Sequence, residues 1–371
     1  MKVLKNLTEK ELRDFATVLG EKAFRGSQLF KWISEGAESF DFMSNLPKKF
    51  KEKLNSESII GNLKLSGKQE SKIDGTVKFL FELVDGNLIE TVFMKYNYGN
   101  SLCVSSQAGC RMGCEFCASG KLGLSRNLRA WEILDQIIKA RSITGEKISH
   151  VVVMGTGEPF DNYENLSRFI HLANDEKGLN LGMRNITVST CGLVPYIHRF
   201  SVDFPQVNLA VSLHAPTDIA RKKIMPVTYR YPLSELMDAC RKYTEITHRR
   251  ITFEYAVVKG VNDSMEDIDE LARITRGINA HINLIPLNDT RETKLISGGR
   301  KRAEEIAKVL ESKGVPATVR RTLGQDIDAA RKRPWAGRWF RWCRMWWPAC
   351  FRRNPENPAE GHCAVDRKSV V

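Results

Sequence analysis

The chain has 371 residues, of which 42% are hydrophobic, and a formal charge of +13. This composition is typical of a globular protein. The basic charge suggests a polyanionic partner such as nucleic acid. No apolar run approaches the roughly 20 residues of a membrane helix, and the first residues lack the apolar core of a secretory signal. We therefore expect a cytoplasmic protein with no membrane partner. Nine cysteines, three of them tightly clustered, suit metal or redox chemistry in a reducing compartment better than a disulfide framework.

Residues 1–60 are predicted to form a small helical module. Thr8 and Glu11 form a capping box ahead of an apolar-periodic segment that stops at Gly20. A second helix is centred on "SQLFKWISE" and a third on "LPKKFKEKL", where Pro47 stands near the helix start.

Residues 61–95 are predicted to form a β-hairpin connector. The segment "TVKFLFELVDGNLIETVFMKY" and its flanks alternate in polarity. Asp74-Gly75 and Asp85-Gly86 interrupt this alternation with dipeptides that favour hairpin turns.

Residues 96–330 alternate short β-branched runs with stretches of helical length. Six runs are separated by amphipathic segments, namely "LCVSS", "VVVM", "ITVS", "NLAVSL", "ITFEYAVV" and "INLIP". Six βα units are too few for a closed eight-stranded barrel. We therefore predict an α/β fold with a partial (βα)6 barrel whose site lies at the carboxyl ends of the strands.

Residues 331–371 break this pattern. They hold ten Lys or Arg against three Asp or Glu, and five of the seven tryptophans, without usable periodicity. The tail thus carries a net +7, which leaves about +6 on the mildly basic remainder. Its composition is what out-of-frame translation or a chimeric join commonly yields.

The segment "CRMGCEFCASG" places Cys110, Cys114 and Cys117 in a C-x3-C-x2-C loop after a predicted strand. Three thiolates leave one position open on a cubane iron-sulfur cluster, whereas a closed structural zinc site takes four ligands, and no fourth Cys or His stands nearby. The spacing favours the cluster. Zinc and unrelated buried cysteines remain alternatives.

This spacing, with an aromatic residue before the third cysteine, resembles the signature of the radical SAM superfamily. The resemblance sharpens to the RlmN/Cfr RNA methyltransferases from about residue 5 to Ala330, on the motifs "LCVSSQAGCRMGCEFCASG", "VVVMGTGEPFDNYENL", "ITVSTCGLVP", "VSLHAP", "INLIPLN" and "TLGQDIDAA". It implies a 4Fe-4S cluster on the three cysteines and S-adenosyl-L-methionine as cofactor. It also implies an electron donor such as flavodoxin or ferredoxin, and an RNA-recognition role for the N-terminal module.

The same resemblance assigns the cofactor pocket to residues that follow successive strands. Taken alone, each has an ordinary explanation as a turn, a cap or a structural histidine. The implied cofactor-binding residues are Phe116, Gly157, Glu158, Ser189, Ser212, Leu213, His214 and Asn288.

The family methylates a ring carbon of adenine in 23S rRNA, C2 in RlmN enzymes and C8 in Cfr enzymes, and RlmN enzymes often act on tRNA as well. By the resemblance, Glu90 is the proton acceptor and Cys103 the cysteine that resolves an RNA–enzyme crosslink. Composition alone would make Cys103 a core residue and Glu90 an exposed strand residue. Cys191 and Cys240 match no role and are interpreted as packing residues. The N-terminal segments favour the RlmN type, with the Cfr type and a noncatalytic iron-sulfur or zinc RNA-binding protein as alternatives.

The resemblance stops at Arg331, where the family has the methyl-carrying cysteine. A guanidinium cannot accept and release a methyl group by this route. We therefore expect the chain to bind the cluster and cleave the cofactor but to methylate poorly or not at all. A genuine basic, aromatic RNA-binding extension, or a substitute carrier at Cys343 or Cys350, are the competing interpretations of the tail.

Overall fold

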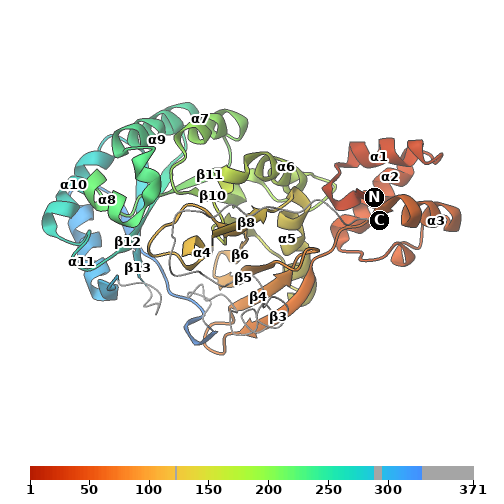
Figure 1. Ribbon diagram of the computed structural model, residues 1–371, viewed down its shortest axis with the longest axis horizontal. Helices are drawn as coiled ribbons and strands as arrows, with labels where there is room; N and C mark the ends of the chain where they lie inside the picture. The colour runs from red at the N-terminus through yellow and green to blue at the C-terminus, as the bar shows by residue number, and fades with distance from the viewer. Residues whose placement is uncertain (122, 288–294, 328–371) are drawn as a thin grey trace, which may run out of the picture. The chain divides into compact units, whose positions relative to one another are not determined.

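Ten strands form one mixed, curved sheet (Figure 1), which runs in the order β14-β13-β12-β11-β10-β9-β6-β5-β4-β3. The computed structural model describes residues 1–121, 123–287 and 295–327, so Asn288 and Arg331 lie outside the described residues. The strands from β6 to β14 run parallel: β6 (Gly99–Cys103), β9 (His150–Val153), β10 (Ile186–Thr190), β11 (Asn208–Ser212), β12 (Ile251–Val257), β13 (Ala280–Pro286) and the short β14 (Ala317–Val319).

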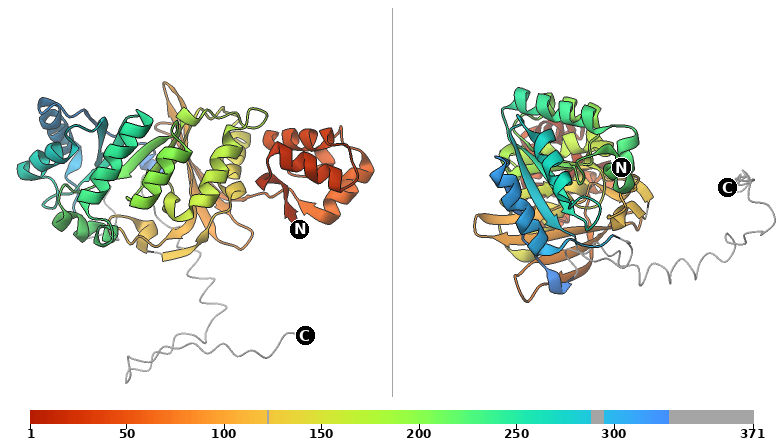
Figure 2. Two further views of the ribbon diagram at one scale, coloured as in Figure 1. Left: turned by 90° about the horizontal axis from the view of Figure 1, so that it is seen from above. Right: turned by 90° about the vertical axis from the view of Figure 1, so that its left-hand side faces the viewer.

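The predicted partial barrel is confirmed, because the six predicted βα runs are the parallel strands β6 and β9 to β13. Helices follow them in the chain and lie on one side of the curved sheet (Figure 2). They are α5 (Ala130–Thr144), α6 (Tyr163–Asn174), α7 (Val194–Asp203), α8 (Asp218–Ile224), α9 (Leu233–Thr247), α10 (Met265–Thr275) and α11 (Gly299–Ser312).

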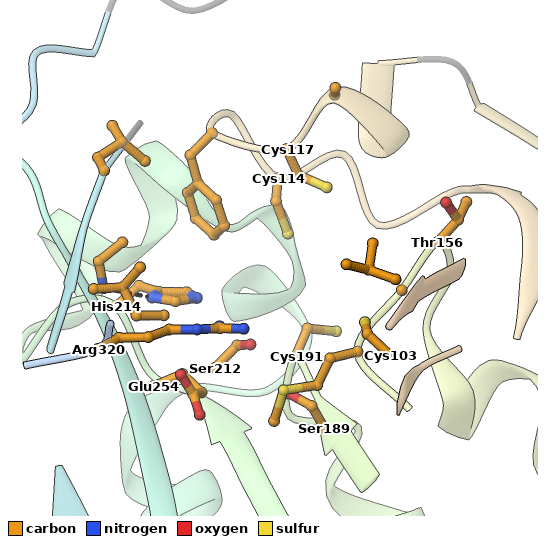
Figure 3. Close-up of a pocket in the computed structure, with 18 of the residues that line it drawn as sticks. Cys103, Cys114, Cys117, Thr156, Ser189, Cys191, Ser212, His214, Glu254 and Arg320 are labelled. Carbon is orange, nitrogen blue, oxygen red and sulfur yellow. Dashed lines mark hydrogen bonds between the residues drawn. The ribbon is translucent and has the colours of Figure 1, made fainter. Parts of the chain in front are cut away.

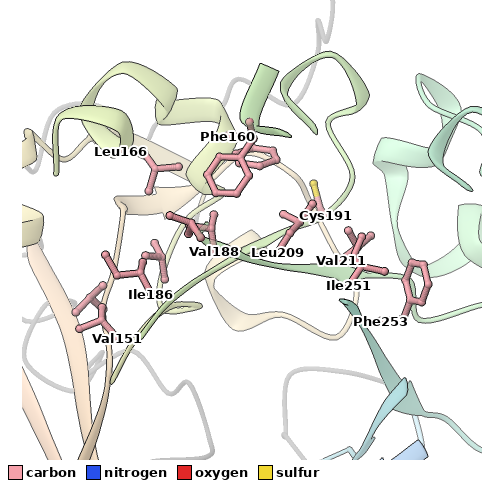
Figure 4. Packing of buried hydrophobic residues seen from close by; sticks show 14 of the residues in the cluster. Val151, Phe160, Leu166, Ile186, Val188, Cys191, Leu209, Val211, Ile251 and Phe253 are labelled. Carbon is pink, nitrogen blue, oxygen red and sulfur yellow. The ribbon is translucent and has the colours of Figure 1, made fainter. Parts of the chain in front are cut away.

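The core lies between this sheet and its helices. Val188 and Leu209 on neighbouring strands are essentially inaccessible and pack near Phe160 and Leu166 (Figure 4). The strand period of two turns alternate residues to the opposite face. On β10, Ile186 and Val188 are therefore buried in this core while Ser189 faces away from it.

The segment predicted as a hairpin connector continues the barrel sheet. Its strands β3 (Lys64–Glu70), β4 (Val77–Glu82) and β5 (Leu88–Tyr96) form an antiparallel meander with turns at the predicted Asp-Gly positions. Strand β5 then pairs antiparallel with β6, Val92 opposite Cys103. The meander thus brings its own side chains to the barrel interior.

The N-terminal module has the three predicted helices, α1 (Glu9–Val18), α2 (Phe24–Glu35) and α3 (Lys48–Glu57). Both bonds of the predicted capping box of Thr8 and Glu11 are formed. The module has its own apolar cluster, which includes Phe15, Leu29 and Phe50. A parallel pair, β1 (Lys2–Val3) with β2 (Ser58–Ile59), joins the two ends of the module.

A buried ion pair connects the start of the chain to helix α5. Lys5 Nζ lies 2.6 Å from Asp135 Oδ1, and both side chains are at most 1% exposed. The backbone N–H of Leu63 donates to the other Asp135 oxygen at 2.6 Å. One carboxylate therefore fixes both the entry and the exit of the N-terminal module.

Residues 320–327, which we call the strap, run from the last strand of the sheet to the first. Arg320 N–H donates to the carbonyl of Leu284 on β13 at 2.8 Å. At the other end, Asp326 accepts from the Ser71 hydroxyl at 2.6 Å and from the Lys72 N–H at 2.9 Å, in the β3–β4 turn. The strap thus links the two edges of the open sheet. None of the described helices is both long and apolar enough to cross a membrane.

Candidate active site

A cavity of about 370 Å³ opens at the carboxyl ends of the parallel strands (Figure 3). Eleven of the residues predicted as functional line it: Glu90, Cys103, Cys110, Cys114, Phe116, Cys117, Gly157, Glu158, Ser189, Ser212 and His214. Leu213 is fully buried in the core and is not among the lining residues. The structure thus gathers residues from five strands and the cysteine loop around one space.

The cysteine loop is part of a hairpin of β7 (Gln107–Cys110) and β8 (Gly123–Asn127), followed within the loop by the short helix α4 (Ala118–Lys121). Gly109 has φ +79°, and a Cβ there would lie 1.9 Å from the carbonyl oxygen of Gly123, so only glycine permits this pairing. Cys117 N–H donates to the Cys114 carbonyl at 3.1 Å, and Glu115 N–H donates to Ile224 of α8 at 2.9 Å. The loop is thereby anchored to the barrel.

The electrostatics around Cys114 disfavour a thiolate that has no cation beside it. Burial, and then the charges of Cys117 and Cys110, raise the pKa of Cys114 to about 12. A bound metal centre reverses this balance because it stabilises thiolates directly. No three His, Cys, Asp or Glu side chains of the described residues already stand at ligand spacing. The loop brings its three thiols to one cavity, and their chemistry suits a cationic metal centre. The thiols do not yet stand at the distances of a complete ligand set.

The Gly157-Glu158 pair follows β9 and is tightly constrained. Gly157 has φ +109°, and a Cβ would lie 2.8 Å from both the Gln107 nitrogen and the Ser106 Oγ. The Glu158 carboxylate accepts from the backbone N–H of Phe160 at 3.0 Å. Its second oxygen accepts from the N–H of Cys191 at 2.7 Å. Burial raises the pKa of Glu158. These bonds hold the carboxyl group in place at the cavity wall.

His214 lies just past β11 in the left-handed region, with φ +56°. Its Nδ1 accepts from the Ala256 N–H at 2.9 Å, and its ring meets Phe116 edge-on at 4.6 Å between centroids. Burial, and then the charge of Arg221, lower the pKa of His214 to about 3. The imidazole is therefore neutral at ordinary pH, and because Nδ1 is an acceptor, the proton sits on Nε2.

Glu90 and Cys103 are thirteen positions apart in the chain, yet they line the same cavity. Because Val92 is directly opposite Cys103, Glu90 lies two residues along β5 on the same face. The Ser105 hydroxyl donates to the Glu90 carbonyl at 2.6 Å. The β5–β6 hairpin therefore places the predicted base beside the predicted resolving cysteine.

The sequence analysis did not single out three charged residues that line the cavity, Glu254, Arg320 and Arg321. Glu254 on β12 accepts from Asn283 Nδ2 at 2.9 Å, and burial raises its pKa while Arg320 of the strap opposes the rise. A carboxylate inside the apolar run "ITFEYAVV" was the available signal. Cys191 is buried, as a packing residue would be, but it also lines the cavity. Cys240 is fully buried in α9.

An open parallel barrel with a three-cysteine loop at its strand ends defines the class of protein, a radical SAM protein. The model of the radical SAM superfamily matches residues 104–272. The model of the ribosomal RNA large subunit methyltransferase N-terminal domain matches residues 3–60.

Relatives resolve the family within this class. The chain is 49% identical to a protein of Clostridioides difficile named "Probable dual-specificity RNA methyltransferase RlmN", over 88% of this chain and 96% of that protein. A protein of the same name from Lachnospira eligens is 50% identical, over 88% and 94%. A radical SAM methyltransferase from Sphaerobacter thermophilus, solved by crystallography, superposes with a TM-score of 0.85 at 42% identity, over 89% of this chain and 98% of that one. The chain belongs to the RlmN family of radical SAM methyltransferases.

Proposed function

We propose that this chain derives from an RNA methyltransferase that modifies C2 of adenine in 23S rRNA and in tRNA. The observation that carries the proposal is the convergence of Glu90 and Cys103 on the cavity that also receives the cysteine loop. Radical generation alone would not need a carboxylate on β5 and a further thiol on β6. The names of the relatives favour C2 over C8 chemistry.

Cys110, Cys114 and Cys117 would hold a 4Fe-4S cluster, with S-adenosyl-L-methionine at the remaining iron. When bound and given one electron by a donor such as flavodoxin or ferredoxin, this pair supplies a 5'-deoxyadenosyl radical. Gly157 and Glu158 would bind its amino end. The rest of the cofactor would lie against Phe116, Ser189, Ser212, Leu213, His214 and, outside the described residues, Asn288.

Glu90 and Cys103 would complete the transfer after the base has become bonded to a methylene on a carrier cysteine. Glu90 takes the proton from the substituted ring carbon. The Cys103 thiolate attacks the carrier sulfur, the carrier's carbon–sulfur bond breaks, and its electron pair and a proton leave a methyl group on the base. The two cysteines end as a disulfide, which a cellular thiol then reduces.

The carrier is the part that this chain lacks, because Arg331 occupies its position. The relatives match 88% of the chain, the coverage expected if the resemblance ends near Ala330. We infer that the described part supports cofactor cleavage, whereas methyl transfer requires a cysteine that the chain does not supply at position 331. The N-terminal module is assigned to RNA recognition, which the match to the ribosomal methyltransferase N-terminal domain supports.

Anaerobic reconstitution tests the first half of this proposal. Near-equal iron and sulfide, with 5'-deoxyadenosine formed on reduction, are expected, and the variant Cys114→Ser should lose both. Bound zinc without cofactor cleavage would instead identify a noncatalytic RNA-binding protein.

Mass spectrometry of RNA from a deletion strain tests the second half. The chain as it stands should give little or no 2-methyladenine, and the Arg331→Cys variant should give more. A full yield from the unaltered chain would overturn the inference about Arg331, and 8-methyladenine from the variant would reassign the target carbon.

A further inference from the structure

Lys78 is a buried lysine that the sequence analysis did not single out. It lies in the middle of the apolar strand β4 and is 3% exposed. Its Nζ lies 2.7 Å from Oε1 of Glu90, whose side chain is 18% exposed. Lysine is almost never buried to this extent without a partner. The pair therefore requires an explanation beyond the stability of the sheet.

The register of the meander puts this pair on the inner face of the barrel. Lys78 is opposite Val92, so it lies diagonally from Glu90 on the same face of the sheet. Val92 is in turn opposite Cys103 on β6. Lys78 and Cys103 thus flank Val92 in one cross-strand row, and Glu90 lies two residues along β5 on the same face. Phe79, which points to the other face, is in the apolar core.

The backbone beneath Glu90 is fixed independently of the lysine. Its carbonyl accepts from the Ser105 hydroxyl at 2.6 Å. The next residue, Thr91, donates its hydroxyl to the Gln136 Oε1 at 2.8 Å, and that oxygen also accepts from the Ser105 N–H at 2.8 Å. These contacts hold the strand. The ammonium of Lys78 holds the carboxylate itself.

We propose that Lys78 is a positioning residue whose ammonium keeps the Glu90 carboxylate ionised and directed into the cavity. The inference rests on the proposed function, in which Glu90 takes a proton from the RNA base. A carboxylate on a largely buried face would otherwise favour its neutral form, which cannot act as a base. The proton passes from the ring carbon to Glu90, and Lys78 takes no part in that transfer. Once Glu90 is neutral, the attraction to Lys78 is lost.

Other titratable and charged groups also surround Glu90. Its neighbouring strands contribute Lys78 from β4, Cys103 from β6 and Cys110 from β7. The remaining titratable or charged residues that line the cavity are Tyr96, Cys114, Cys117, Glu158, Cys191, His214, Glu254, Arg320 and Arg321. Among the described residues, the ammonium of Lys78 lies within ion-pair distance of Glu90, at 2.7 Å. Substituting Lys78 therefore tests what this ion pair does to the Glu90 carboxylate.

The test is a pH titration of the full chain carrying glutamate labelled with ¹³C at the side-chain carboxyl, with Glu90→Gln to identify the Glu90 signal. Lys78→Met should move the midpoint of Glu90 upward by about 1 to 3 pH units. Lys78→Arg should keep the midpoint of the unaltered chain. Lys64→Met is the matched control, because it cuts an exposed lysine–glutamate pair between β3 and β4 and should leave the Glu90 midpoint in place. Coincident midpoints for Lys78→Met and the unaltered chain would refute the proposal.

Loss of folding in Lys78→Met is itself informative when the double variant Lys78→Met/Glu90→Gln is measured beside it. If the uncompensated carboxylate is the cause, the double variant recovers the fold, because removing both charges costs less than removing one. If the double variant also fails to fold, lysine acts in packing and the proposal is wrong.

The role assigned to Glu90 is tested separately in the Arg331→Cys background. There, Lys78→Met and Glu90→Gln should both slow release of methylated RNA, and Lys78→Arg should rescue it. A shifted Glu90 midpoint together with unchanged RNA release in Glu90→Gln would leave the ionic coupling standing and reject the proposed function of Glu90.

Discussion

The neutral, buried His214 should make the folded chain lose stability as the pH falls below about 6.5. Its pKa lies at about 3 in the folded protein, against an ordinary value of 6.5. Below 6.5 the unfolded chain therefore binds a proton that the folded chain refuses. The stability that the neutral His214 contributes is fully present above pH 6.5 and is lost progressively as the pH falls toward 3.

The size of this effect follows from linkage at 1.36 kcal/mol per pH unit. At pH 5, which is 1.5 units below the ordinary value, His214 should cost about 2 kcal/mol of the free energy of unfolding. Burial raises the pKa of Glu158 and of Glu254, so these carboxyl groups change stability in the opposite direction. The effect of His214 on stability is therefore separated from theirs by comparing the unaltered chain with a His214 variant.

His214→Asn is the suitable variant because asparagine tolerates the left-handed backbone at φ +56°. Urea unfolding of both proteins between pH 7.5 and 5 should show the unaltered chain losing about 2 kcal/mol more than the variant. His248→Asn is the matched control, since His248 has φ +55° but is exposed at the end of α9. Parallel stability curves for the unaltered chain and His214→Asn would refute the reasoning.

Three further predictions address the cofactor, the N-terminal module and the thiol chemistry. Gly157→Ala should lower the yield of 5'-deoxyadenosine about tenfold or more at unchanged iron content, because the added Cβ strains a left-handed backbone against its neighbours; equal yield would contradict the tight fit. Lys5→Met should cost about 3 to 5 kcal/mol in urea unfolding because it strands the buried Asp135, and a loss below about 1 kcal/mol would show the pair to be dispensable. Cys103→Ala in the Arg331→Cys background should leave RNA covalently attached on a denaturing gel; free methylated RNA would reject the resolving role.

Local sequence signals predicted most of the fold correctly. The capping box at Thr8, the turns at Gly75 and Gly86 and the six parallel strands all depend on contacts close in sequence or on periodicity. The continuity of the meander with the barrel could not be predicted this way. It depends on β6 pairing with β5 on one side and with the distant strand β9 on the other, which a local pattern does not specify.

The candidate site was predictable where motifs end strands and unpredictable where side chains meet across them. Cys114 and Gly157 follow strands and were found by their motifs. Lys78 and Glu254 were not, because each interrupts an apolar run and only the register shows which face it occupies. Cys191 was interpreted as a packing residue because burial and cavity lining cannot be separated by composition.

The strap is the last described segment before Arg331, where the resemblance to the family ends. Asp326 is held by the β3–β4 turn, which connects to the strand that carries Lys78. Because the strap also lines the cavity through Arg320 and Leu323, its path fixes where the chain leaves the described barrel. Position 331 follows Ile327 by four residues, a reach of at most about 14 Å for an extended chain. A cysteine restored at position 331 is thus tethered by only four residues to a segment that lines the cavity, and this short tether is the reason for choosing Arg331→Cys as the test variant.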